Sequence, residues 1–169
     1  MMADGVGLEA RMDELSARVR ELEAIRELTK LRNAFHHCLN SLNWTGLGAL
    51  FTTDAHLDYG SLGDVRGRTA IQQYYSTLLP KMVEFQGASE VVLMNFNQVH
   101  QVVAVDGDRA TGACFFEEHV RFDKEDLVYQ SVGRFSDSYV LADGRWLFDR
   151  VELDHYWLVP ENKKFRWPW

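Results

Sequence analysis

Two polar residues on one stretch of the chain have side chains that could handle protons and hydrogen bonds. His36 and Asn40 are four residues apart, so on a helix they share one face, with His37 close by. An imidazole with a pKa near 6.5 suits proton transfer at neutral pH, whereas an amide only donates and accepts hydrogen bonds. This polar row could face a bound ligand, or it could be ordinary surface; the spacing allows both.

A second group of candidates lies on two predicted strands joined by a turn at Asp106-Gly107. Alternation puts Phe96, Gln98 and His100 on one face of the first strand, and Cys114, Phe116 and Glu118 on one face of the second. Antiparallel pairing about the turn brings Glu118 beside Phe96 and Cys114 beside His100. The two titratable groups are therefore about four residues out of register, and we expect no direct hydrogen bond between them.

Burial should change how these two groups ionise. A glutamate in an apolar row is expensive to bury as a carboxylate. We expect a raised pKa for Glu118, a lowered pKa for His100, or both, if they face the interior. The structural alternatives are a salt-bridged Glu118 at the rim and a hydrogen-bonded core histidine at position 100.

Aromatic residues make up 12% of the chain, which favours a large, flat, apolar ligand. Tyr59 and Tyr129 could direct phenol hydroxyls toward such a ligand. The chain also ends in an aromatic tail, residues 160–169, which we expect to cap a pocket or to pack on a neighbouring subunit.

The elements that must position these residues change in type along the chain. Apolar residues spaced by three and four predict one or two helices over residues 8–42, the first of them over 8–28. These are followed by a short helical turn over 47–51, a strand over 56–59, and a helix from Thr69, its candidate N-cap, to Pro80.

The second half of the chain is predicted to be strands, over 91–105, 110–122, 127–141 and 145–158, with hairpin turns at Asp106-Gly107 and Asp143-Gly144. This order predicts a single α+β domain over residues 1–169, with helices packed on one face of a curved, mostly antiparallel sheet.

Composition excludes several classes of function. The net charge is −7 without a basic cluster, which argues against nucleic acid as a partner. No apolar run is long enough to cross a membrane, and the first residues lack a signal-peptide pattern, so we expect a cytoplasmic protein. Cys38 and Cys114 are expected to be free core thiols. The usual metal-site, phosphate-loop and dinucleotide motifs are missing from the sequence, so we expect no metal and no cofactor.

The layout resembles the NTF2-like fold and, within it, the SnoaL-like and scytalone-dehydratase-like branch. The resemblance rests on the segments LTKLRNAFHHCLNSLNWTGLGALFTTDAHLDYG, VAVDGDRATGACFFEEH and RFSDSYVLADGRWLFDRVELD. The opening LEARMDELSARVRELEAIREL is also similar to that of bacterial bile-acid 7α-dehydratases. The resemblance implies a cone-shaped domain with an internal pocket.

The resemblance also implies where catalytic residues should lie, and this chain departs from the pattern. The Asp expected on the early helix, four residues before Trp44, is replaced by Asn40, and the Tyr before it is replaced by Phe35. The His expected on the hairpin strand is replaced by Phe96. The further acid is matched by Glu118 and the strand Tyr by Tyr59.

We therefore expect a cofactor-independent lyase, cyclase or isomerase acting on a hydrophobic polycyclic or polyketide-like molecule. The alternative is a binding or assembly protein without catalysis. The expected catalytic residues are His100, Glu118, Asn40, His36 and Tyr59. The expected substrate contacts are Phe35, Phe96, Gln98, Phe116, Tyr129 and Trp44. In this interpretation Asn40 points into the cone in place of the family's Asp.

The N-terminal helix carries more apolar surface than one small domain needs to bury. Together with the aromatic tail, this surface predicts a homodimer or a homotrimer.

Overall fold

The structure is a computed structural model that describes residues 3–124 and 128–160. The helices are α1 (Ala3–Asn40), α2 (Trp44–Gly48), the 3-10 turn η1 (Gly60–Leu62) and α3 (Arg68–Gln86). The strands are β1 (Phe51–Asp58), β2 (Asp64–Arg66), β3 (Val91–Asp106), β4 (Arg109–Phe122), β5 (Val128–Ala142) and β6 (Arg145–Pro160).

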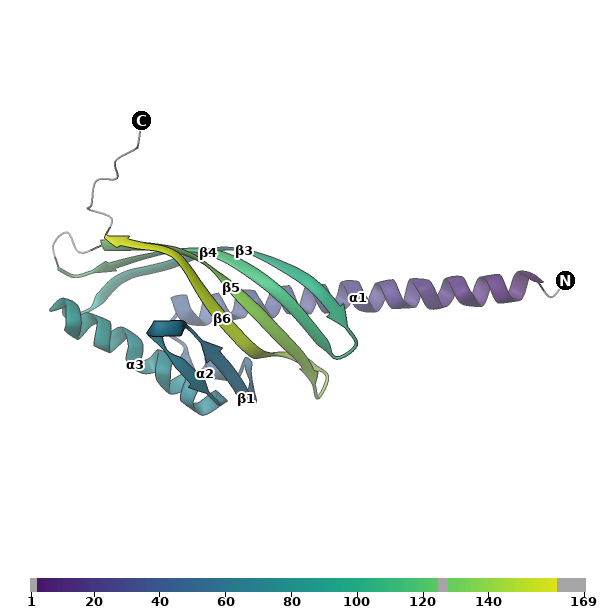
Figure 1. Cartoon of the computed structure of the whole chain (residues 1–169), viewed down its shortest axis with the longest axis horizontal. Helices are drawn as coiled ribbons and strands as arrows, with labels where there is room; N and C mark the ends of the chain where they lie inside the picture. Colours follow the sequence, from purple (N-terminus) through teal and green to yellow (C-terminus); the bar gives the residue numbers. More distant parts are fainter. Residues whose placement is uncertain (1–2, 125–127, 161–169) are drawn as a thin grey trace, which may run out of the picture.

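The six strands form one sheet in the order β2-β1-β6-β5-β4-β3. All neighbours are antiparallel except β1 and β6, which run parallel. The sheet is long and curved, with the helices gathered toward one face, while the N-terminal part of α1 extends well beyond it (Figure 1). The predicted α+β cone with a mostly antiparallel sheet is confirmed.

The tight turns explain why the hairpins could be found in the sequence. Asp143 and Gly144 both have positive φ, 52° and 73°, which is the conformation of a two-residue turn matching the twist of paired strands. Gly107 at the β3–β4 turn has φ 59°, where a side chain is strained and glycine is not. All four predicted long strands agree with β3–β6 to within two residues.

The first half of the chain departs from the prediction in several places. The predicted one or two helices over 8–42 are the single helix α1, which begins at Ala3, and the predicted turn over 47–51 is helix α2 over 44–48. The strand begins at Phe51, since Phe51 pairs with Phe148 of β6 and is completely buried. Strand β2 had no sequence signal, because three residues at an edge are too few to show a period.

Helix α3 also differs from its prediction. It begins after Gly67, which has φ 89° and makes no side-chain cap, so Thr69 is not the N-cap. It runs through Pro80 to Gln86 and ends at Gly87 in the left-handed conformation. The predicted stop at Pro80 was therefore wrong.

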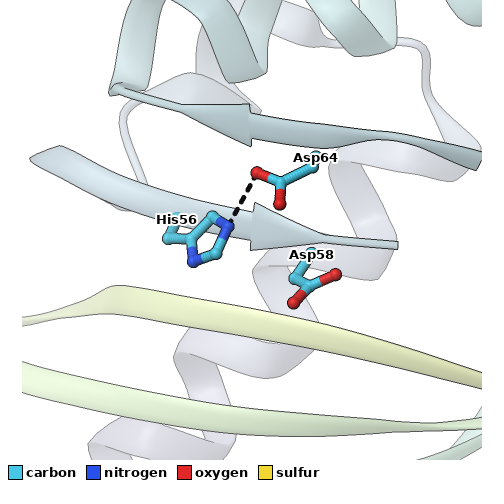
Figure 2. Close-up of side chains that lie close together, drawn as sticks. All are labelled: His56, Asp58 and Asp64. Carbon is cyan, nitrogen blue, oxygen red and sulfur yellow. Dashed lines mark hydrogen bonds and ion pairs between the residues drawn. The ribbon is translucent and has the colours of Figure 1, made fainter. Parts of the chain in front are cut away.

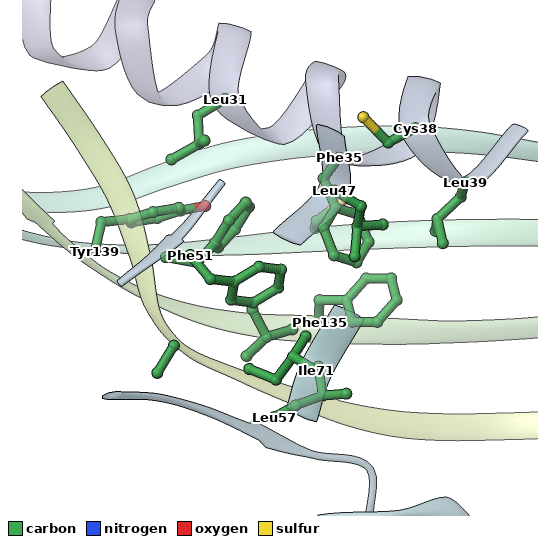
Figure 3. Close-up of a cluster of buried hydrophobic side chains, with 14 of the residues drawn as sticks. Leu31, Phe35, Cys38, Leu39, Leu47, Phe51, Leu57, Ile71, Phe135 and Tyr139 are labelled. Atoms are coloured by element: carbon green, nitrogen blue, oxygen red, sulfur yellow. The ribbon is translucent and has the colours of Figure 1, made fainter. Parts of the chain in front are cut away.

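The core lies between the sheet and the helices, and aromatic rings fill much of it (Figure 3). Phe35 of α1 is its centre: its ring lies within 6.1 Å, centroid to centroid, of the rings of Phe51, Tyr75, Phe135 and Phe148. Cys38 and Cys114 are free and buried, as predicted. Residues 161–169 of the aromatic tail lie outside the described residues.

Candidate functional site

Strands β3 and β4 have an inner and an outer face, and the candidate residues lie on the inner one. Val99 and Phe115 on the outer face are 70% and 44% exposed, whereas their neighbours Cys114 and Phe116 are buried. Glu118 pairs with Phe96 and Cys114 pairs with His100, as the sequence predicted. The inner face therefore carries both His100 and Glu118, four residues apart along the ladder.

His36 is the helix histidine that faces the interior; His37 is exposed. His36 Nδ1 bonds to Gln98 Oε1, and Gln98 Nε2 donates to Asn33 Oδ1 over 2.6 Å. Because the amide oxygen can only accept, this hydrogen bond places a proton on Nδ1 of His36. Burial and the positive charge of Arg32 lower the pKa of His36 to about 3, so its imidazole is neutral at neutral pH.

Asn40 does not point into the interior. It is exposed at the end of α1, one turn after the buried His36. The expectation that Asn40 takes the inward place of the family's Asp is therefore wrong. The physical reason is that the buried stripe of α1 ends with Cys38 and Leu39, and the chain turns at Leu42, which has φ 55°.

A chain of polar groups, buried except for the half-buried His100, crosses the interior from α1 to β3. Arg32 Nε lies 3.2 Å from Asp137 Oδ2, and both side chains are fully inaccessible to solvent. Tyr139 donates its hydroxyl to the same carboxylate oxygen over 2.8 Å. His100 Nε2 lies 3.0 Å from the Tyr139 oxygen. One helix and two strands thus contribute to a single network.

The direction of these hydrogen bonds fixes the state of His100. The Tyr139 proton goes to Asp137, so the Tyr139 oxygen accepts the proton of His100 Nε2. The lone pair of His100 is then on Nδ1, which is buried and has no hydrogen-bond partner among the described residues. Burial and the charge of Arg32 lower the pKa of His100 to about 4, in the direction that the sequence predicted.

The role of Arg32 could not be predicted from the sequence. Its guanidinium carbon lies 4.2 Å from the ring centre of Phe135, 4.5 Å from that of Phe35 and 5.3 Å from that of Phe148. These rings and the carboxylate of Asp137 stabilise a cation that would be very costly to bury alone. Burial raises the pKa of Asp137, and the positive charge of Arg32 opposes that rise.

Glu118 has a different environment from His100. Ser131, itself fully buried, donates its hydroxyl to Glu118 Oε2 over 2.9 Å. Burial nevertheless raises the pKa of Glu118 to about 7, with the Ser131 hydrogen bond and His119 opposing the rise. A carboxyl group with this pKa can both give and take a proton at neutral pH.

The remaining predicted site residues are mostly part of the core. The hydroxyl of Tyr59 is hydrogen bonded to that of Tyr75, and burial raises the pKa of both phenols. Trp44 stacks on Tyr75 with the ring centres 6.4 Å apart. Phe116 is buried against Phe135, and Phe35 is fully enclosed. The side chains of Phe96 and Tyr129 lie outside the described part of the structure.

A second polar cluster lies at the edge of the sheet, where His56, Asp58 and Asp64 come together (Figure 2). His56 Nε2 donates to Asp64 over 2.9 Å. Arg150 of β6 donates to His56 Nδ1 over 2.8 Å and to Asp58 over 3.0 Å. Because a guanidinium already supplies the positive charge between these groups, we interpret the cluster as an ion-pair network and not as a metal site.

A family model for the SnoaL-like domain matches residues 20–152. The chain belongs to the SnoaL-like family. The matched range runs from the middle of α1 to β6 and includes both the Arg32–Asp137–Tyr139–His100 network and Glu118.

Three individual proteins illustrate what the chain is similar to. An uncharacterized protein of Mycobacterium tuberculosis, Rv2910c, is 27% identical over 146 residues, which cover 85% of this chain and 93% of the relative. A solved structure titled as a scytalone dehydratase from Novosphingobium aromaticivorans superposes with a TM-score of 0.71 at 18% identity, covering 88% of this chain and 93% of the other. A hexachlorocyclohexane dehydrochlorinase, LinA-type3 from Novosphingobium barchaimii, gives a TM-score of 0.65 at 13% identity, covering 94% and 99%. At these identities the two structures show a shared fold.

None of the helices within the described residues is long and apolar enough to cross a membrane.

Proposed function

We propose that this SnoaL-like protein is a cofactor-independent lyase, cyclase or isomerase that acts on a hydrophobic polycyclic molecule. The observation that carries the proposal is the pair of titratable groups on the inner face of β3 and β4, each with its pKa displaced by burial. Two solved structures with the same fold carry the names of elimination enzymes, a scytalone dehydratase and a hexachlorocyclohexane dehydrochlorinase, and these names favour the same broad class of chemistry here.

In this proposal Glu118 is the group that moves the proton. Its pKa of about 7 leaves a large fraction ionised at neutral pH, ready to take a proton from an acidic carbon of the substrate. The hydroxyl of Ser131 holds one carboxylate oxygen, which leaves the other for the substrate.

His100 orients the far end of the substrate. Its Nδ1 is a hydrogen-bond acceptor held in place through Tyr139 and Asp137. A neutral imidazole with a pKa of about 4 accepts a hydrogen bond from a substrate hydroxyl more readily than it takes the proton. We therefore assign His100 to substrate positioning.

The separation of the two groups supports a substrate of several rings. Four residues along a strand correspond to roughly 13 Å. A molecule that contacts Glu118 and His100 together must span that distance along the inner face of β3 and β4. Two buried free thiols are typical of a reducing compartment, and we propose that the enzyme works in the cytoplasm.

A turnover assay on polycyclic β-hydroxyketones tests this function, with products measured by mass spectrometry. Glu118→Gln keeps the shape of the side chain but removes its base, so turnover should fall by roughly 10²–10⁴-fold. Glu117→Gln is the matched control, since Glu117 lies on the other face of the same strand and contacts His119. That variant should retain wild-type turnover.

The competing function is binding of a hydrophobic molecule without catalysis. It is favoured by the exposed Asn40 and by the distance between Glu118 and His100, which do not converge on one point. If the wild type binds the ketones without converting them, or if Glu118→Gln keeps full turnover, acid–base catalysis by Glu118 is refuted.

A further inference from the structure

The first part of α1 has no partner within the described chain. Every described side chain from Gly7 to Glu23 is exposed, whereas burial begins around Ala24 and Ile25. Figure 1 shows this part of α1 extending away from the sheet and the other helices. Most of the stability of protein helices comes from packing of an apolar face, so a helical segment without contacts to its own domain is expected to pack against something else.

The exposed segment carries an apolar stripe with a distinct period. Its large apolar residues are spaced alternately by four and three, and they are Leu8, Met12, Leu15, Val19 and Leu22. They are 51–64% exposed. An average spacing of 3.5 residues is the heptad repeat of a coiled coil, and it differs from the wider stripe of a helix that covers a domain core.

We propose that residues 8–22 form a parallel two-stranded coiled coil with a second copy of this chain. In the heptad, the three leucines occupy the d positions, while Met12 and Val19 occupy the a positions. Leucine at d combined with a β-branched residue at a favours two parallel strands. A seam of this kind is complementary to itself, which is what a symmetric dimer requires.

The flanking charges agree with this partner and this orientation. Arg18 occupies a g position, and Glu23 is the e position that follows it in the next heptad. In a parallel pair, Arg18 of one chain meets the partner's Glu23, which gives an attractive contact on each side of the seam. An antiparallel pair instead places g positions against g positions and e against e, so that arginines oppose arginines and Glu9 and Glu23 oppose glutamates.

The proposal does not depend on the catalytic one, because the coiled-coil segment ends before the first residue of the buried network, Arg32. Loss of the dimer and loss of Glu118 function are therefore separable.

Sedimentation equilibrium at micromolar concentration tests the coiled coil. The wild type should have twice the 19.5 kDa mass of the chain. The double variant Leu15→Glu/Leu22→Glu puts like charges into the seam and should sediment as a single chain. Ala17→Glu is the matched control, since it adds the same charge at the outer f position of the same segment, and it should remain a dimer.

A cross-link tests the orientation, and near-ultraviolet circular dichroism checks that each variant keeps a folded domain. Leu22→Cys should form an interchain disulfide on mild oxidation, because the two Leu22 positions adjoin in a parallel pair and lie at opposite ends of the segment in an antiparallel pair, whereas Ala17→Cys at the outer f position should not. A wild type of single-chain or three-chain mass, or a double variant with a wild-type fold that remains a dimer, would overturn the proposal. Equal cross-linking of both cysteine variants would do so as well.

Discussion

The state of His100 depends on one hydroxyl group. Tyr139 donates to Asp137 and so accepts from His100 Nε2, which leaves Nδ1 with the lone pair. While this chain of hydrogen bonds is intact, the imidazole is held in the tautomer with its proton on Nε2. A group held in one tautomer and one orientation is suited to recognising a substrate hydroxyl.

Replacing Tyr139 by Phe should remove this control. Without the phenol oxygen, His100 loses its acceptor at Nε2, and we expect both tautomers in the nitrogen chemical shifts of the ring, where the wild type shows only the Nε2–H form. The Phe variant of Tyr74, whose hydroxyl donates to the Leu62 carbonyl elsewhere in the fold, is the control and should leave the His100 spectrum unchanged. A wild-type His100 spectrum in Tyr139→Phe would refute the network.

Residue patterns in the sequence predicted one part of the site and missed another. The inner-face position of His100 and Glu118 follows from a period of two and one turn, both of which are local. Arg32 was not predicted, because an arginine among the charges of a long helix usually faces water. Its partner Asp137 is far away in the sequence, and only the packing of α1 against the sheet brings the two together.

At the scale of elements, the Arg32–Asp137 pair joins α1 to β5 inside the core. The two charges are completely buried, so each depends on the other for compensation. Removing one partner leaves an isolated buried charge, and this costs more stability than losing an ion pair at the surface.

Arg32→Met should therefore lower the free energy of unfolding by about 3–5 kcal/mol, measured by urea denaturation. Lys30→Met is the comparison on the same helix. Lys30 pairs with Glu27 at the surface, with both side chains about half exposed, so its loss should cost less than about 1 kcal/mol. Equal changes in the free energy of unfolding for the two variants would show that the buried pair contributes no more to stability than the surface pair.

The end of α1 shows why the position of Asn40 could not be predicted. Its register four residues before Trp44 suggested an inward side chain, but register along a helix does not determine where the buried stripe stops. Here the stripe stops at Leu39, and the chain leaves the helix through the left-handed Leu42. Tertiary packing, which buries His36 against Gln98 of β3 and leaves the side chain of Asn40 exposed, decided the outcome.

At the scale of the whole molecule, the fold was predictable because its strongest signals are independent of one another. Two hairpin turns, four alternating strands and an early amphipathic helix together specify helices on a curved antiparallel sheet. The parallel pairing of β1 with β6 and the short strand β2 were not visible, since both depend on contacts between distant segments. The same curvature gives the inner face on which Glu118 lies.

Burial of Glu118 also makes the stability of the whole domain depend on pH. Its pKa is raised from 4.5 to about 7, so between these values the unfolded chain has lost the proton that the folded chain keeps. The contribution of Glu118 to the stability of the fold is therefore largest at low pH and is lost as the pH rises to 7. Relative to Glu118→Gln, the wild type should lose up to about 3 kcal/mol across this range, by urea denaturation at each pH.

The most direct test of the account is the titration of the Glu118 carboxyl itself, followed by carbon-13 chemical shift in glutamate-labelled protein. Glu118→Gln identifies the resonance, and Glu117→Gln shows that the neighbouring carboxyl is not the one observed. We predict a midpoint close to pH 7, because burial raises the pKa of the carboxyl despite the opposing hydrogen bond from Ser131. A midpoint near pH 4.5 would mean that Glu118 is an ordinary solvated carboxylate, and this result would contradict its proposed acid–base role.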